Sequence, residues 1–141
     1  MDKLNQSHIV EINSFSSPPD KVKYVYMATC ILMMDSSEIQ TKSNWSDEEL
    51  EDYYYKLGKL KLFKDPQFLS KLKGIDFEKV ESSKIKKIKK LITNHPKRSK
   101  EWVKKDMKSS NVANYCIFLV VNAAFKYNEL FKKTEPLRRQ H

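Results

Sequence analysis

The 141-residue chain is poor in glycine, cysteine and histidine, with two, two and three residues respectively. A loop that binds phosphate through backbone N–H groups needs several closely spaced glycines, and Gly58 and Gly74 lie far apart. A zinc site needs closely spaced Cys and His ligands, and the spacing of these residues does not provide them. We therefore expect no metal site and no cofactor.

Long apolar runs are also missing. No run reaches the roughly 18 residues of a membrane span, and the N-terminus lacks the apolar core of a signal peptide. Cys30 and Cys116 lie in apolar stretches, which predicts reduced core residues in a cytosolic protein instead of a disulfide. An apolar setting raises a thiol pKa, so it disfavours a catalytic pair of Cys116 and His95 that spacing alone leaves open. The acids of residues 46–52 are typical of a helix N-terminus, and we expect no enzymatic activity.

The scarcity of glycine favours helices over turn-rich β-structure. The sequence predicts helices at about 19–34, from 46 through the tyrosines at 53–55, and at 66–73, 82–94, 99–108 and 110–134. Ser46 and Glu49 have capping-box spacing, and Ser99 is the expected cap of the helix that follows it. We expect Gly58 to weaken the second helix and Gly74 to end the third.

Two of these helices have a clear apolar face. The expected buried face of 19–34 comprises Val22, Val25, Tyr26, Thr29, Leu32 and Met33. The helix at 110–134 has a heptad seam that comprises Ala113, Ile117, Val120, Ala124, Tyr127, Phe131 and Thr134. Four further residues widen this seam into an expected core face, namely Cys116, Leu119, Ala123 and Leu130.

Positive charge is concentrated in one window. The net charge is +9, and residues 84–108 contain eleven basic and two acidic side chains, whereas residues 1–55 contain four and ten. Such a window attracts a negative partner, which could be nucleic acid, an acidic protein lattice or an anionic membrane, unless it is simply a solvated face. Residues 82–93 could form a membrane-surface helix, but their narrow stripe of Ile85, Ile88 and Ile92 favours packing on a core.

Three stretches together resemble the microtubule-binding domain at the tip of the dynein heavy-chain stalk. They are HIVEINSFSSPPDKVKYVYMATCILM at 8–33, DPQFLSKLKGIDFEKV at 65–80, and residues 82–140, which end in EPLRRQ. They cover nearly the whole chain, and DPQFL with the tyrosines before it is closer to axonemal than to cytoplasmic heavy chains. Two positions depart from the family: Leu119 stands about where a tryptophan is usual, and Lys104 replaces an acid of cytoplasmic forms.

The resemblance implies an all-α fold, a compact bundle of about six helices that caps the two strands of an antiparallel coiled-coil stalk. Residues 1–17 would end the outgoing strand, 18–135 would form the binding domain, and 136–141 would start the return strand. Pro18, Pro19 and Pro136 would be hinges, because proline interrupts the helical hydrogen-bond ladder. The register of the coiled coil would then set the affinity for microtubules.

The resemblance also implies a set of tubulin contacts. On this chain they are Lys21, Lys23, Lys64, Lys71, Lys73, Lys104, Lys105 and Lys108. The lysines of 84–90 would face solvent, and Trp45 and Trp102 would be packing residues. The implied partners are the microtubule and the rest of the heavy chain, with its ATPase ring outside this chain, and not a membrane or nucleic acid. The implied location is the cytoplasm and cytoskeleton, in a cilium or flagellum axoneme.

The alternative function is a basic helical nucleic-acid-binding domain, which the charge alone supports. The sequence lacks a recognisable recognition helix and the aromatic platform of single-strand binders.

Overall fold

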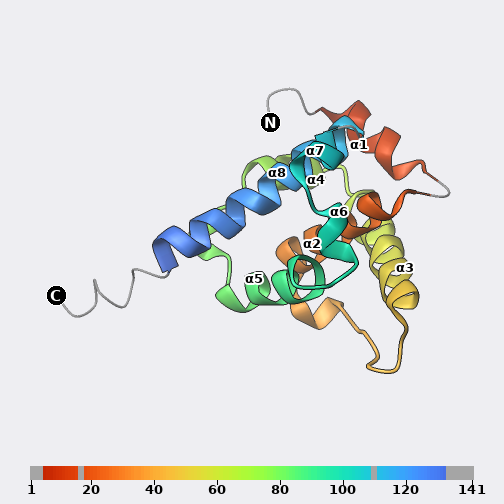
Figure 1. The fold of residues 1–141 in the computed structure, drawn as a ribbon. Helices are drawn as coiled ribbons and strands as arrows, with labels where there is room; N and C mark the ends of the chain where they lie inside the picture. The colour runs from red at the N-terminus through yellow and green to blue at the C-terminus, as the bar shows by residue number, and fades with distance from the viewer. Residues whose placement is uncertain (1–4, 16–17, 109–110, 133–141) are drawn as a thin grey trace.

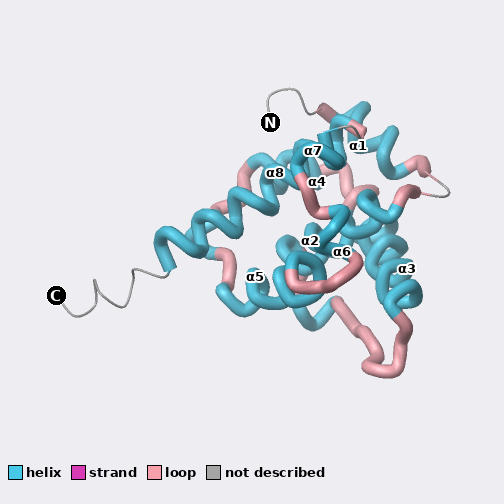
Figure 2. Tube along the Cα trace, in the orientation of Figure 1, coloured by secondary structure: helices cyan, strands magenta, loops and turns pink. Residues whose placement is uncertain are grey.

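The computed structural model describes residues 5–15, 18–108 and 111–132, and within these ranges the chain is helical and contains no β-strand (Figures 1 and 2). The all-α prediction is therefore confirmed. Pro136 and the expected return strand at 136–141 lie outside the described residues. The α-helices of the described part are α1 (Gln6–Asn13), α2 (Asp20–Met33), α3 (Asp47–Leu57), α4 (Phe68–Lys73), α5 (Ser82–Ile88), α6 (Arg98–Glu101), α7 (Lys104–Lys108) and α8 (Val112–Tyr127).

Shorter helical turns extend or connect these helices. Two 3-10 turns, Ser36–Glu38 and Phe77–Lys79, precede α3 and α5. The helices α3, α5 and α8 each continue into a π-helical turn, namely Gly58–Leu62, Lys89–Thr93 and Asn128–Lys132. The Phe63 N–H donates to the Gly58 carbonyl at 2.7 Å, and the Asn94 N–H to the Lys89 carbonyl at 2.8 Å. These wider turns bond two of the last carbonyls that an α-helix leaves unpaired at its C-terminus.

Helix α2 is the centre of the bundle. It packs against α3, α5, α6 and α8, so it is buried on nearly every side instead of on one stripe. The expected face is buried except for Met33, which is half-buried, and five further apolar residues between Tyr24 and Ile31 are buried as well. The spacing of apolar residues predicted only one buried face of α2, whereas the neighbouring helices cover its other faces as well.

Gly58, directly after α3, lies against α2. A Cβ at this position would lie 3.0 Å from Cys30 Sγ and 3.0 Å from Tyr26 Cδ2. The α-helix ends at Leu57, as expected from Gly58, and the chain continues from Gly58 to Leu62 as a π-helical turn. The glycine is therefore required by contact between two helices and not by a change of direction.

An aromatic stack attaches α4 to α2. The ring of Tyr26 lies 3.9 Å from that of Phe63 at an angle of 6°, and Phe63 lies 4.4 Å from Phe68. Helix α4 begins at Phe68, two residues later than expected, because Asp65 first forms a turn in which its carboxylate accepts the Gln67 N–H. Gly74 ends the helix as predicted.

Helix α8 contributes the second large apolar surface. Its buried residues include the predicted Ala113, Ile117, Val120 and Ala124. Leu119 and Leu130 were expected in the core, but they are 38% and 61% exposed. Four buried residues of α8 lie outside the expected face, namely Asn114, Phe118, Val121 and Phe125.

Helix α1 packs against α8. Ile9 and Ile12, which lie three residues apart in this helix, are both fully buried. The Asn111 side-chain amide donates to Glu11 at 3.1 Å and so joins α1 to the start of α8. Pro19, in an extended conformation, is the N-cap of α2.

The predicted helix at 99–108 is divided in two. Ser99 is not its cap, because the His95 ring Nδ1 accepts the N–H groups of Lys97 and Arg98 and so caps α6 from outside. The chain breaks at Trp102, whose indole N–H donates to Asn122 at 3.1 Å. The indole ring also contacts Phe118 edge to face, so the predicted packing role of Trp102 is confirmed. The predicted cap is corrected: it is His95 and not Ser99.

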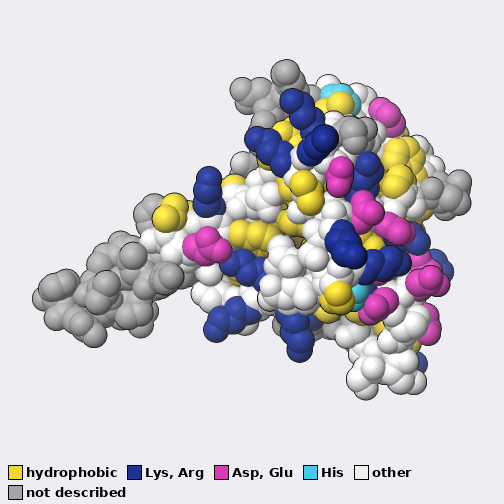
Figure 3. Space-filling view, viewed as in Figure 1, with side chains coloured by type: hydrophobic (Ala, Val, Ile, Leu, Met, Phe, Trp, Pro, Cys, Tyr) yellow, Lys and Arg dark blue, Asp and Glu magenta, His cyan; other side chains and the backbone are white. Residues whose placement is uncertain are grey.

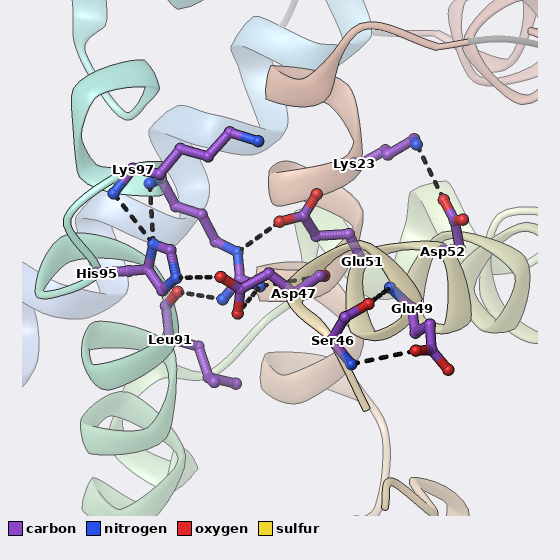
Figure 4. A network of polar contacts seen from close by, with 10 residues as sticks. Lys23, Ser46, Asp47, Glu49, Glu51, Asp52, Leu91, His95 and Lys97 are labelled. Carbon is purple, nitrogen blue, oxygen red and sulfur yellow. Dashed lines mark hydrogen bonds and ion pairs between the residues drawn. The ribbon is translucent and has the colours of Figure 1, made fainter. Parts of the chain in front are cut away.

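A buried ion pair joins three segments of the chain (Figure 4). Arg98 and Glu51 are 1% and 2% exposed, and Arg98 Nε donates to Glu51 Oε2 at 2.9 Å. The other guanidinium nitrogens donate to the Leu91 carbonyl at 2.9 Å and to the Asp47 carbonyl at 3.3 Å. His95 Nε2 lies 3.2 Å from Asp47 Oδ2, and since its Nδ1 accepts backbone N–H groups, Nε2 carries the proton and donates.

Replacing Ile117 by Ala should lower the free energy of unfolding by about 2–5 kcal/mol, because it leaves a cavity among fully buried side chains. Urea denaturation followed by circular dichroism measures the change. The control is Leu119→Ala on the same helix, which should cost about 1 kcal/mol or less because Leu119 is partly exposed. Equal losses for the two variants would contradict this description of α8.

Replacing Arg98 by Met should cost about 3–5 kcal/mol, because Glu51 is then a buried charge without its partner. The double variant Arg98→Met with Glu51→Leu removes both charges and should recover a large part of that loss. Urea denaturation of the two variants decides the point: a double variant less stable than the single one would show that the ion pair is not the source of the cost.

Candidate binding surface

The eight lysines named above fall into three groups on the folded chain. Lys21 and Lys23 lie in the first turn of α2, the second group lies on α4 and the turn before it, and the third lies on α7. All but Lys21 and Lys23 are exposed, and those two are half-buried.

A hydrogen bond brings the first and third groups together. Lys21 Nζ donates to the backbone carbonyl of Asp106 at 3.2 Å, which places the start of α2 against α7. Lys104 and Lys108 are four residues apart in α7 and so lie on one side of it. The second group is held to the middle of α2 through the aromatic stack of Phe68, Phe63 and Tyr26.

Two of the lysines are paired with carboxylates. Lys23 Nζ lies 2.9 Å from Asp52 Oδ1 (Figure 4), and this hydrogen bond raises the pKa of Lys23. Lys71 Nζ lies 2.9 Å from Asp65 Oδ2, and the bond from Lys71 lowers the pKa of Asp65. Both pairs reach the surface, so each contributes little to stability and can exchange its partner.

Sequence reasoning missed these pairings. Lys23 and Asp52 are on different helices, and no spacing in the chain connects them. Lys71 and Asp65 lie in DPQFLSK, where an acid before a short helix and a lysine within it could have suggested the contact. The Arg98–Glu51 pair was missed for the same reason as the Lys23–Asp52 pair, since its members are 47 positions apart.

The lysines of α5 and its extension divide into two kinds. Lys86, Lys87 and Lys90 are exposed, as expected. Lys84 and Lys89 are half-buried, because Lys84 Nζ donates to the Met34 carbonyl at 2.9 Å and Lys89 Nζ lies 2.7 Å from Glu129 Oε1. The apolar stripe of this helix is buried against the domain, which confirms core packing and leaves no free apolar face for a membrane surface.

The charges are unevenly placed on the surface. On the face in Figure 3, Lys and Arg side chains are spread over α5, α6 and α7, and Asp and Glu gather over α3. No helix of the described residues is long and apolar enough to cross a membrane, and the same residues contain no cluster of three His, Cys, Asp or Glu that could hold a metal.

The two cysteines are free and buried, as the sequence predicted. Burial raises the pKa of the Cys30 thiol to about 12, and its Sγ lies 3.5 Å from the Tyr54 carbonyl. The hydrogen bonds of His95 go to Asp47, Lys97 and Arg98, where the ring has a structural role. Among the described residues, the hydrogen bonds of His95 therefore do not include Cys116.

The fold and surface define an all-helical, lysine-rich binding domain. The profile of the family described as the microtubule-binding stalk of dynein motor matches residues 1–141. The chain belongs to this family, so it is a microtubule-binding stalk domain and not a catalytic one.

Several axonemal and ciliary dyneins are similar to the chain. Human dynein axonemal heavy chain 10 is 27% identical over 140 residues, and human dynein axonemal heavy chain 3 is 29% identical over 142 residues. The ciliary dynein beta chain of Tripneustes gratilla is 25% identical over 139 residues. These matches cover 98–99% of this chain but only 3% of the length of each relative.

Cys30 should resist alkylation in the folded protein. With a pKa of about 12, roughly one thiol in ten thousand is ionised at pH 8, and the thiol is also buried. Mass spectrometry of a Cys116→Ala variant treated with iodoacetamide measures the rate, with the urea-unfolded variant as the reactive control. Comparable rates in the folded and unfolded states would contradict the burial.

Proposed function

We propose that the eight lysines form the tubulin-binding face of the domain. The observation that carries this proposal is the hydrogen bond from Lys21 to the Asp106 carbonyl, because it joins the basic start of α2 to the basic helix α7. Tubulin is strongly acidic, and complementary charge at an interface speeds association and aligns the partners.

We further propose that the domain is regulated through its stalk. Residues 1–17 end the outgoing strand, 136–141 begin the return strand, and residues 18–135 lie between hinges at Pro18, Pro19 and Pro136. Helix α1 is bonded to the start of α8 through Glu11 and Asn111, so a movement of the outgoing strand would act directly on α8. Heptad side chains settle in discrete registers, and each register would correspond to one affinity.

The ATPase ring, in this proposal, lies elsewhere in the heavy chain and acts through the stalk. The axonemal and ciliary names of the relatives support a place on the cytoskeleton of a cilium or flagellum. Neither membrane nor nucleic acid is a partner in this proposal. The competing proposal of a nucleic-acid-binding domain has only the charge in its favour, and the one arginine of the described residues, Arg98, is buried.

Replacing Lys23 by Glu should weaken co-sedimentation with microtubules roughly three- to tenfold, because it reverses a charge within the proposed face. The control is Lys42→Glu, an exposed lysine of the loop before α3 with the same change in net charge. A DNA shift assay at matched salt tests the competing function. Equal loss for both variants, or DNA binding stronger than microtubule binding, would refute the proposal.

Replacing Asp52 by Asn should strengthen microtubule binding about two- to fivefold, because it releases the Lys23 ammonium from its internal partner. Glu48→Gln, an equal charge change on the exposed side of α3, is the control and should have less effect. The same co-sedimentation assay measures both. An Asp52 variant that binds no better than the Glu48 variant would place Lys23 outside the interface.

A further inference from the structure

The chain carries a second basic surface, formed by Lys86, Lys87 and Lys90 and called here the α5 lysine face. These residues lie within about 100° of one another around the helix axis, opposite the buried stripe of Ile85 and Ile88. All three side chains are exposed, and none of them forms an ion pair with another described residue. The opposite face of the helix is packed against the domain, so these three residues stay on the solvent side.

The neighbouring charges leave this face positive. Lys84 is held by the Met34 carbonyl and Lys89 by Glu129, so the acid nearest the end of α8 is already paired. At the start of α5, Asp35 and Glu81 line a pocket together with Lys84 and Lys87. These two acids partly offset the positive charge at that end of the helix. The free charge is therefore greatest from Lys86 to Lys90.

The α5 lysine face is separate from the proposed tubulin-binding face. Lys84 is bonded at the C-terminal end of α2, and Lys21, at the N-terminal end, is bonded to α7. At 1.5 Å per residue, the length of α2 between these two contacts is roughly 20 Å. The two faces are therefore attached to α2 about one helix length apart.

We infer that the α5 lysine face binds a flexible acidic polypeptide, a run of Glu or Asp side chains in extended conformation. Lys86 and Lys90 are one helical turn apart, about 6 Å along the axis. In an extended peptide, alternate side chains point the same way and are spaced about 6.6 Å apart. Successive carboxylates on one side of such a peptide therefore match successive lysines on this helix.

The same surface is less suited to the other polyanions. A membrane needs an apolar face to insert, and Ile85, Ile88 and Ile92 are all buried. Nucleic-acid recognition favours arginine, whose planar guanidinium pairs with phosphate in a bidentate manner. All three cations of this face are lysines, whose ammonium groups act as point charges that suit carboxylates equally well.

The test uses the full 141-residue chain and a fluorescently labelled poly-glutamate peptide, with binding followed by anisotropy at low ionic strength. A triple variant should bind the peptide about tenfold more weakly; it carries Lys86→Glu, Lys87→Glu and Lys90→Glu. Added salt should weaken the binding of the peptide to the unsubstituted chain. The control carries Lys42→Glu, Lys56→Glu and Lys61→Glu, three exposed lysines elsewhere, with the same change in net charge. It should lose about threefold or less.

An equal loss in the two triple variants, or no loss in the first, would overturn the inference. A short DNA duplex that binds the chain more tightly than the peptide at the same salt would overturn the choice of partner. If the first variant unfolds more readily, the three Lys→Gln changes replace it, with an expected loss of about threefold. The assay contains no microtubules, so its result is independent of the test of the tubulin-binding face.

Discussion

The buried Arg98–Glu51 ion pair is the constraint on which the arrangement of this domain depends. It joins α3, the end of the α5 segment at Leu91 and the start of α6, three parts of the chain that no local signal brings together. A buried charge without its partner costs several kcal/mol of folding free energy, so the packing of each of these three segments depends on the other two. The result is a frame around one side of α2 that holds its neighbours at fixed positions.

Helix α2 connects this buried frame to the two segments that carry surface lysines. Its N-terminal turn is bonded to α7 through Lys21, and its C-terminal end to α5 through Lys84 and the Met34 carbonyl. One proposed basic surface is therefore bonded to the N-terminal turn of α2 through Lys21, and the other to its C-terminal end through Lys84. A substitution that shifts α2 would therefore change the position of both surfaces. Helix α1, in contrast, is bonded to the bundle through Asn111 at the start of α8.

The exposure of the candidate lysines was easier to predict from the sequence than their hydrogen-bond partners. Their exposure on α4 and α7 follows from local patterns, since lysine on a helix that also has an apolar stripe faces water. The internal partners of Lys23 and Lys21 were not predictable, because Asp52 and the Asp106 carbonyl become neighbours only after the helices pack. The break at Trp102 has the same origin, since its indole is held by Asn122 of another helix.

By itself, the sequence determined the all-helical class, most helix positions and the reduced state of both cysteines, because these follow from periodicity, capping residues and composition along the chain. Tertiary structure alone decided that α2 is surrounded, that Leu119 is exposed although it extends a heptad seam, and that His95 and not Ser99 caps α6. The physical reason is common to all three: burial and hydrogen-bond partners are properties of the neighbours that packing brings, and local spacing does not contain them.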